Sequence, residues 1–234
     1  MTIAVKICGI STEESLEAAI GAGADYAGFV FFPRSPRNVS LERAKALARK
    51  ADGRIKTVAL TVDADDGAIE AITGEISPDF LQLHGSETPE RALALRQRLG
   101  VRVIKALKVD SPASVEAAQA FEPAADLLLF DAKPPATSNA LPGGNGLSFD
   151  WTLLAGASLR PDFMLSGGLN AGNVLEALRT SGARAIDVSS GVETSPGVKS
   201  PALIKEFIQI AKAFPEAGIA SPEHHKDKNH AVRF

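Results

Sequence analysis

The stretch YAGFVFFPRSPRNVSLERAKALARKADGRIKTVALTV, residues 26–62, contains two short apolar runs separated by one helical segment. The runs 26–32 and 55–62 are rich in β-branched and aromatic residues and are apolar on both faces, as strands of a parallel sheet covered by helices should be. Between them, LERAKALARK has helical spacing of its apolar residues, and Ser40 precedes it as a cap. The stretch therefore predicts a strand, a helix and a second, parallel strand.

The same pattern recurs along the whole chain. Six further runs predict strands: IAVKI (3–7), DFLQLH (79–84), VRVIKAL (101–107), DLLLFD (126–131), DFMLSG (162–167) and ARAIDVSS (183–190). Eight strands, each followed by a helix, predict an α/β fold: a parallel eight-stranded (β/α)8 TIM barrel that forms a single domain over residues 1–214. A doubly wound open sheet is the alternative, but it needs a glycine-rich phosphate fingerprint that GISTEES (9–15) lacks.

Polar residues and glycines mark the ends of the predicted helices. Either Ser11, which has the capping-box spacing to Glu14, or Thr12 begins the first helix. The other expected caps are Ser40, Ser86 or Thr88, and Ser200; the expected glycine ends are Gly21 or Gly23, Gly100 and Gly182.

The last stretch, residues 215–234, lacks periodicity and holds three of the four histidines. We expect it to be a polar, mobile tail. Its His-His pair with a third histidine could bind a metal, but a solvated terminal segment is the favoured interpretation.

Composition narrows the classes of function. A chain with 45% hydrophobic and 23% charged residues can form a sizeable core, and a net charge of −3 argues against binding to nucleic acid or a membrane surface. A single cysteine excludes an intramolecular disulfide framework and a multi-thiolate metal site. With no signal peptide and no apolar run of ~18 residues, we expect a cytoplasmic protein. Monomer and homodimer both remain open.

Chemically useful residues follow the predicted strands, at the barrel end where active sites lie. The glycine-containing turns SGGLN (166–170) and SSG (189–191) follow the seventh and eighth strands. Each alone could be an ordinary tight turn. Together, at the loops that usually bind phosphate, they predict a phosphate site at Gly167, Gly168, Ser190 and Gly191.

Six motifs in order resemble the phosphoribosylanthranilate isomerase family of tryptophan biosynthesis: VKICGI (5–10), GFVFFPRSPRNVS (28–40), LQLHG (81–85), LLFDAK (128–133), LSGGLN (165–170) and DVSSGVE (187–193). The resemblance covers roughly residues 3–213. KICGI with LQLHG and DVSSGVE is a specific combination, whereas many phosphate-binding barrels share SGGLN.

The resemblance implies a phosphorylated small-molecule substrate and an Amadori rearrangement. N-(5-phospho-β-D-ribosyl)anthranilate would become 1-(2-carboxyphenylamino)-1-deoxy-D-ribulose 5-phosphate, with Asp131 as general acid and Cys8 as general base. It implies no cofactor and no metal, because the opened, protonated imine is itself the electron sink.

The chemistry makes a demand on each member of this pair. An Asp with its reference pKa of ~3.9 is ionised at neutral pH, so a donor role requires burial or a neighbouring anion. A thiol with a pKa of ~8.5 needs a positive neighbour to act as a base. Lys6 lies on the same strand face as Cys8 under strict alternation. A strand-end cysteine is more commonly a small buried hydrophobe, but the motif context favours the reactive thiol.

Four further residues are expected to bind substrate. Arg37 presents a planar fork suited to the anthranilate carboxylate, with Arg34 as the alternative. Gln82 and His84 share a strand face and are expected to line the pocket, although a core-edge role for His84 is equally open. Asp187 is expected to bond a ribose hydroxyl.

Two loops could cover the substrate, FPRSPRNVS (32–40) and the Pro- and Gly-rich stretch 132–150. We expect loop 132–147 to be more mobile than the strands without ligand. LPGGNG (141–146) lacks the Lys-Ser/Thr of a P-loop, so it does not predict a nucleotide site.

Three other functions compete with this assignment. A histidine-pathway isomerase is expected to carry Asp at the position of Cys8, and an indole-glycerol-phosphate synthase relative needs a catalytic lysine. A non-catalytic phosphate sensor would have lost the acid–base pair, whereas Cys8 and Asp131 are both present.

Overall fold

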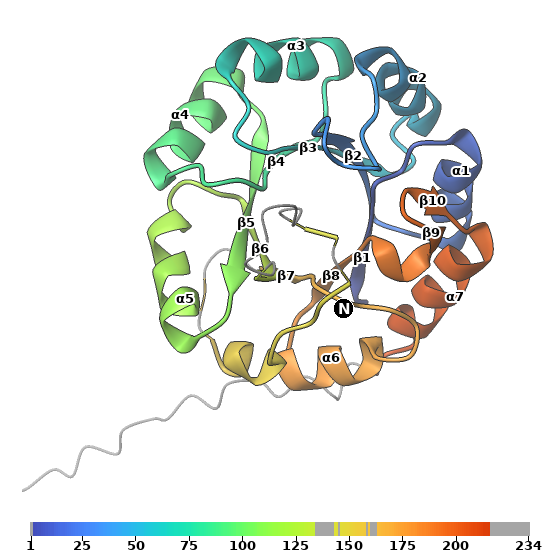
Figure 1. Cartoon of the computed structure of the whole chain (residues 1–234), viewed down its shortest axis with the longest axis vertical. Coiled ribbons are helices and arrows are strands. Elements are labelled where there is room, and N and C mark those ends of the chain that lie inside the picture. The colour runs from blue at the N-terminus through green and yellow to red at the C-terminus, as the bar shows by residue number, and fades with distance from the viewer. Residues whose placement is uncertain (1, 134–142, 145, 158, 160–162, 216–234) are drawn as a thin grey trace, which may run out of the picture.

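The computed structural model describes residues 2–133, 143–144, 146–157, 159 and 163–215. Its eight parallel strands form a closed barrel in chain order, and the helices form a ring around it (Figure 1). The strands are β1 (Ala4–Cys8), β2 (Tyr26–Phe31), β3 (Lys56–Thr61), β4 (Phe80–Leu83), β5 (Arg102–Val109), β6 (Leu127–Ala132), β7 (Phe163–Leu165) and β8 (Ala185–Val188). The predicted TIM barrel is confirmed, and the open sheet is excluded because β1 pairs with β8.

Seven α-helices cover the barrel within the described residues: α1 (Glu13–Ala22), α2 (Leu41–Ala51), α3 (Asp66–Ile76), α4 (Pro89–Leu99), α5 (Pro112–Ala117), α6 (Val174–Ser181) and α7 (Pro201–Lys212). A 3-10 turn, η1 (Ala118–Phe121), extends α5. Between β6 and β7, the described residues contain only the 3-10 turn η2 (Trp151–Leu154). The expectation that a helix follows every strand is therefore wrong for β6, within the described residues.

The helix caps settle the alternatives that the sequence left open. Thr12, not Ser11, caps α1, because its side chain accepts a hydrogen bond from the backbone of Ser15 at 3.2 Å. Gly23 ends the same helix in the left-handed conformation, with φ of 85°. Thr88 caps α4 in the same way, so the sequence alternatives Ser11 and Ser86 are wrong.

Side chains alternate between the barrel interior and the helices. On the outside, residues such as Ile7, Leu81 and Phe130 pack against the helices in the main hydrophobic core. Inside, the floor of the barrel is apolar and includes Val58, Phe80, Ile104, Leu129, Met164 and Ala185. The next inward positions along β1, β4 and β8 are polar, so the interior changes from apolar to charged toward the carboxyl ends of the strands.

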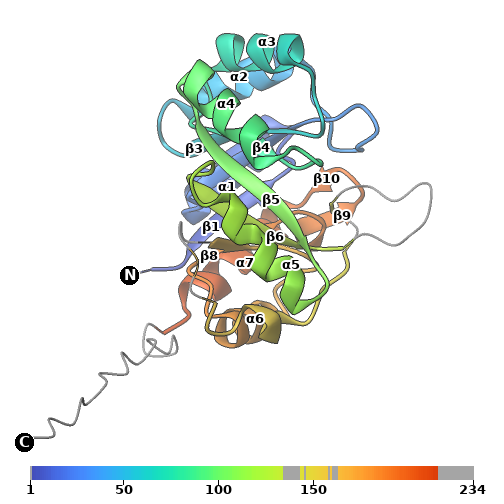
Figure 2. The same cartoon turned by 90° about the vertical axis from the view of Figure 1, so that its left-hand side faces the viewer.

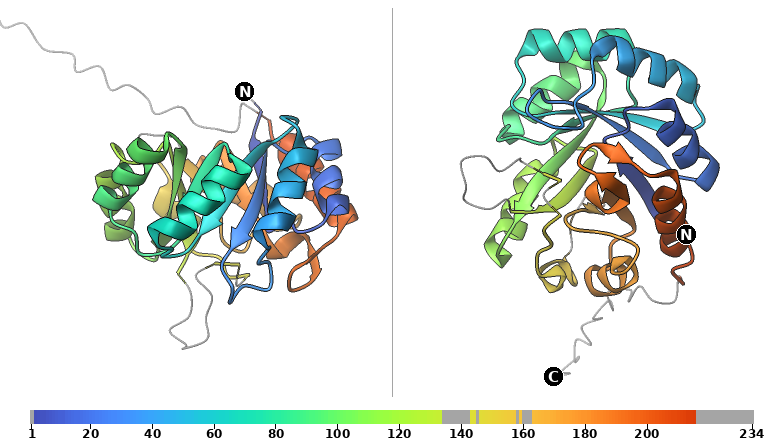
Figure 3. Two further views of the ribbon diagram at one scale, coloured as in Figure 1. Left: turned by 90° about the horizontal axis from the view of Figure 1, so that it is seen from above. Right: turned by 45° about the vertical axis from the view of Figure 1, so that its right-hand side comes forward.

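Two short strands, β9 (Glu193–Ser195) and β10 (Val198–Lys199), form a hairpin between the 3-10 turn η3 (Ser190–Val192) and α7. This hairpin lies at the carboxyl end of the barrel (Figure 2). The N-terminus lies at the opposite end, as the strand arrows in Figure 3 show. The candidate site residues follow the carboxyl ends of the strands, so they lie at the end of the barrel opposite the N-terminus.

Several sequence expectations fall on residues that the structure does not describe. Residues 134–142 and 145 of the expected mobile loop, and 216–234 of the expected tail, lie outside the described residues. The domain boundary at 214/215 stays a prediction. In the described part of the chain, no helix is long and apolar enough to cross a membrane.

Candidate active site

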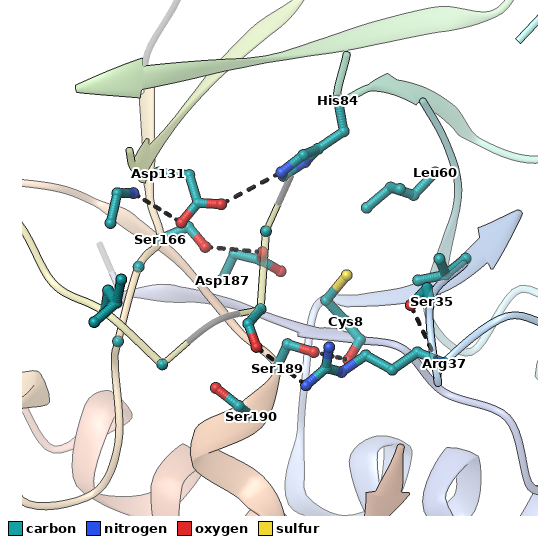
Figure 4. Close-up of a pocket in the computed structure, with 18 of the residues that line it drawn as sticks. Cys8, Ser35, Arg37, Leu60, His84, Asp131, Ser166, Asp187, Ser189 and Ser190 are labelled. Atoms are coloured by element: carbon teal, nitrogen blue, oxygen red, sulfur yellow. Dashed lines mark hydrogen bonds and ion pairs between the residues drawn. The ribbon is translucent and has the colours of Figure 1, made fainter. Parts of the chain in front are cut away.

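A pocket at the carboxyl ends of the strands is lined by side chains from almost every part of the barrel. Cys8 reaches it from β1, His84 from the end of β4, Asp131 from β6 and Asp187 from β8. Figure 4 shows the Cys8 sulfur pointing into the same space as His84 and Asp131. Residues far apart in the sequence are thus brought together by the closure of the barrel.

Cys8 is the last residue of β1 and lies in the mouth of the barrel, packed against Val30 and Leu60. Only 6% of its surface is exposed, yet it lines the pocket. Burial raises the pKa of its thiol above the ordinary value of 9.0, although the ammonium of Lys6 opposes this shift. The resting thiol is therefore protonated at neutral pH.

Lys6 lies two residues before Cys8 on the same inner face and is completely buried. Its Nζ lies 2.8 Å from Oδ1 of Asp187, and Oδ2 of Asp187 accepts a hydrogen bond from Ser166 at 3.2 Å. Burial lowers the pKa of Lys6, but Asp187 and Cys8 more than offset it, so the pKa lies above its ordinary value. Lys6 is a buried ammonium ion beside the thiol.

Asp131 faces the pocket from β6 and is flanked by two basic side chains. His84 Nε2 lies 3.3 Å from Asp131 Oδ2, and Lys108 Nζ lies 3.8 Å from the same oxygen. The backbone N–H of Ala132 donates to Oδ1 at 2.9 Å. Burial raises the pKa of Asp131, but these partners outweigh it and hold the pKa below 3.8. The burial expected from the sequence is present, but the net shift of the pKa is opposite to the one that a proton donor needs.

His84 is buried, with 6% of its surface exposed, and lines the pocket. Burial lowers its pKa although the Asp131 carboxylate opposes this, so the imidazole is neutral at neutral pH. Gln82 Nε2 lies 2.9 Å from His84 Nδ1, and Gln82 itself is fully buried beneath the ring. The amide of Gln82 donates to Nδ1, and Nε2 lies 3.3 Å from Asp131 Oδ2 and 3.2 Å from Lys108 Nζ. Gln82 thus contacts His84 and is not among the residues that line the pocket.

Arg37 and Arg34 occupy different environments. Arg34 is exposed, with its guanidinium 6.0 Å from the Phe32 ring centroid. Arg37 is 5% exposed and lines the pocket. Its Nε and Nη2 each donate to Glu193 at 2.8 Å, a bidentate pair that fixes the guanidinium plane. The geometry therefore separates the two arginines that the sequence left as alternatives.

Glu193, at the start of β9, also binds a second cation. Lys199 Nζ lies 2.6 Å from its Oε1 and donates to the backbone carbonyl of Ser189 at 3.0 Å. Burial raises the pKa of Glu193, but Arg37 and Lys199 hold it below its ordinary value. Sequence reasoning missed Glu193 and Lys199. The only signal was the glutamate that ends the DVSSGVE motif.

The two glycine turns expected to bind phosphate lie side by side at the pocket edge. Gly167 and Gly168 have φ of 92° and 64° and line the pocket together with Ser190. Gly191 lies behind them, and a Cβ there would be 1.9 Å from the carbonyl oxygen of Leu169. Gly191 thus lets the two turns approach each other. No long helix begins in the second turn, because η3 is a three-residue 3-10 turn, so backbone N–H groups are the available donors.

Comparison with known proteins decides what this pocket belongs to. Residues 5–210 match the family described as N-(5'phosphoribosyl)anthranilate (PRA) isomerase. The chain belongs to the PRA isomerase family. The resemblance inferred from the motifs is thereby confirmed. A PRA isomerase of Parvibaculum lavamentivorans is 54% identical over 213 residues, which cover 91% of this chain and 99% of that protein.

Solved PRA isomerases share the fold. The structure from Thermotoga maritima is 34% identical, covers 90% of this chain and 98% of its own, and superposes with a TM-score of 0.81. A second structure, in complex with reduced 1-(o-carboxyphenylamino)-1-deoxyribulose 5-phosphate, is 33% identical over the same shares with a TM-score of 0.78. In the part of this chain that the structure describes, no group of three or more His, Cys, Asp or Glu side chains could hold a metal ion.

Proposed function

We propose that this chain catalyses the Amadori rearrangement of N-(5-phospho-β-D-ribosyl)anthranilate to 1-(2-carboxyphenylamino)-1-deoxy-D-ribulose 5-phosphate in tryptophan biosynthesis. It would be an intramolecular oxidoreductase that interconverts an aldose and a ketose. The observation that carries the proposal is one pocket that holds a thiol, a carboxyl group, a buried arginine and two glycine turns. A related PRA isomerase binds a reduced form of the expected product, which supports the same substrate class here.

Asp131 and Cys8 are the proposed acid and base. Asp131 donates a proton to the furanose ring oxygen as the bond from C1′ to that oxygen breaks, which gives an open-chain protonated imine. The Cys8 thiolate then removes the proton from C2′, and the electron pair moves to the imine nitrogen. The resulting enol tautomerises to the ketone. The substrate itself is the electron sink, so the reaction calls for neither a cofactor nor a metal.

The protonation states of Asp131 and Cys8 constrain this mechanism. The directions of the two pKa shifts give an Asp131 carboxylate and a Cys8 thiol at neutral pH. The reactive form, with protonated Asp131 and a Cys8 thiolate, contains the same number of protons. The substrate brings a phosphate and a carboxylate into the pocket, and this negative charge raises the pKa of Asp131 toward the donor state.

The substrate groups have matching partners around the pocket. The bidentate pair with Glu193 occupies Nε and one edge of Nη2 of Arg37, and Nη2 also donates to the carbonyl oxygen of Gly144 at 3.4 Å. Arg37 would bind the anthranilate carboxylate with its Nη1 donors. The backbone groups of Gly167, Gly168, Ser190 and Gly191 would bind the phosphate. His84 and Asp187 face the space between, where the ribose would lie. Gln82 would act on substrate only through the orientation of His84.

Anthranilate fluorescence provides the test. Freshly made phosphoribosylanthranilate is mixed with the wild-type chain, Cys8→Ala and Asp131→Ala, and the decay of fluorescence is followed. Turnover by the wild type and its collapse in both folded variants is the expected result. If the wild type binds a product analogue but shows no turnover, the pocket is a phosphate sensor. If Cys8→Ala retains nearly full turnover, the activity stands and the proposed base is wrong.

The remaining expectations concern the setting of the reaction. We propose that the chain works in the cytoplasm on a phosphorylated small molecule, without nucleic acid or membrane partners. Size-exclusion chromatography with light scattering would decide between monomer and homodimer.

A further inference from the structure

The most deeply buried charge in the pocket region is the ammonium of Lys6, which the reaction scheme above does not use. Its side chain has no exposed surface, and it extends inside the barrel below Cys8. A buried ammonium is unfavourable unless it is paired, and Asp187 pairs with it at 2.8 Å. An apolar side chain could fill the same space without that requirement. The position of this charge therefore calls for another explanation.

Gly28 shows where the ammonium is directed. Gly28 is the residue of β2 that pairs with Cys8 in the barrel. A Cβ at Gly28 would lie 3.2 Å from Lys6 Nζ and 3.3 Å from Cys8 Sγ. Both atoms thus converge on the space beside Gly28 that a side chain would fill, and the positive charge of the ammonium lowers the pKa of the thiol against the effect of burial. A Cβ at position 28 would therefore press against both atoms.

Besides Lys6, and besides His84, Asp131 and Arg37, which line the same pocket, two charged groups act on the thiol. Asp187 faces it from β8 and Lys199 from β10, while β2 and β3 contribute the apolar Val30 and Leu60. Lys199 is bound by Glu193 and by Ser189, whereas the Lys6 ammonium and the sulfur both adjoin the space beside Gly28. Asp187 has two effects: it pairs with the Lys6 ammonium, and its own negative charge raises the pKa of the thiol.

We propose that Lys6 is a positioning residue for the general base: its ammonium, held by Asp187, binds and stabilises the Cys8 thiolate that removes the C2′ proton. The proposal rests on the proposed function only in assigning the base to Cys8. No atom is transferred to or from Lys6. The ammonium keeps its proton throughout, and its charge offsets the charge of the sulfur before the sulfur takes the substrate proton.

The single cysteine allows the thiol to be titrated directly, without any isomerase assay. The full-length chain is treated with iodoacetamide across a range of pH, and alkylation of Cys8 is followed by intact mass. Lys6→Met is expected to move the alkylation midpoint upward by about one to three pH units, because a neighbouring opposite charge is lost. At neutral pH, each unit of upward shift in this midpoint should lower the thiolate fraction tenfold, and kcat with it, whereas KM is expected to change little.

The matched control is Lys105→Met. Lys105 is also a buried lysine, 2% exposed, in an ion pair of 2.7 Å with Glu87, but it lies on the helix side of the barrel. Its loss should leave the alkylation midpoint of Cys8 unchanged. Lys6→Arg, which keeps the charge, should retain most of the wild-type midpoint.

Asp187→Asn gives a test of opposite sign, which also covers the case in which Lys6→Met fails to fold. Removal of this negative neighbour should lower the alkylation midpoint. A merely structural role would move both variants in the same direction, toward the ordinary thiol value of ~8.5. An unchanged midpoint in folded Lys6→Met, or shifts of the same sign in both variants, would overturn the proposal. If the wild type shows no turnover but the midpoints of Lys6→Met and Asp187→Asn shift in opposite directions, the Lys6–Cys8 coupling is supported and the proposed activity is rejected.

Discussion

The imidazole of His84 lies 3.3 Å from the carboxylate of Asp131 and lowers the pKa of that acid. The proposed proton donor is therefore held in its ionised form by a neutral neighbour that Gln82 orients from below. The contact sets how readily Asp131 can gain the proton that ring opening requires.

Replacement of His84 should therefore change the titration of Asp131. In His84→Asn, loss of the hydrogen bond should raise the pKa of Asp131 by about one unit, because burial then opposes ionisation with less compensation. The acid limb of the profile of kcat/KM against pH should move upward by the same amount. Steady-state fluorescence assays between pH 3 and 8 measure it, and an unmoved acid limb would show that His84 does not tune the acid.

The wild type should show a broad pH plateau. The pKa of Asp131 is lowered below 3.8, so the acid limb should appear only below that value, provided that the fold persists. The pKa of Cys8 is raised above 9.0, so the alkaline limb should begin above that value. Between them the number of bound protons is constant, so kcat/KM for free enzyme should stay flat. A steep rise of kcat/KM between pH 6 and 8 would contradict this picture.

Loss of the carboxylate that orients Arg37 should weaken substrate binding. Glu193→Gln removes the charge that binds both Arg37 and Lys199, so we expect KM to rise about tenfold, the equivalent of ~1.4 kcal/mol. We expect kcat to fall less. Glu206→Gln, an exposed glutamate on α7, is the control for the change in net charge and should leave KM unaltered. Equal KM values for both variants would refute the orienting role of Glu193.

The close approach of the two phosphate turns should depend on Gly191. In Gly191→Ala the new Cβ would overlap the carbonyl oxygen of Leu169, so the turns must separate and affinity for a phosphorylated product analogue should fall at least tenfold. Gly74→Ala in α3 meets no neighbouring atom within 4 Å and should stabilise the fold by about 1 kcal/mol. Isothermal titration and thermal unfolding of both variants provide the comparison. Unchanged affinity in Gly191→Ala would remove this turn from the phosphate site.

The sequence predicted the barrel well because short runs that are apolar on both faces are typical of parallel strands buried on both faces, and few other folds contain such strands. Each predicted strand overlaps an observed one, and the differences are confined to one or two residues at the strand ends. The helix expected after the sixth strand was wrong within the described residues, because regular alternation elsewhere was extended to a Pro- and Gly-rich segment. Local pattern thus predicted the elements better than it predicted this irregular connection.

The candidate site could be predicted only in part, because several of its contacts join residues that are far apart in the sequence. Strand ends identify Cys8, His84, Asp131 and Asp187 as pocket residues, since the carboxyl ends of parallel strands converge. Burial raises the pKa of Asp131, and the net downward direction depends first on His84 and then on Lys108, which is paired with Asp131 across β5 and β6. The Arg37–Glu193 pair joins residues 156 positions apart, and no local spacing predicts it.

The ion pair between Lys6 and Asp187 joins residues 181 positions apart, across the seam where the first strand meets the last. During synthesis β1 leaves the ribosome long before β8 exists, so until then Lys6 has no carboxylate partner and cannot be buried beside the thiol at low free energy. A chain caught before closure should therefore carry a cysteine with ordinary reactivity. The rate at which Cys8 reacts can thus report, in a refolding experiment, the moment at which the ring becomes complete.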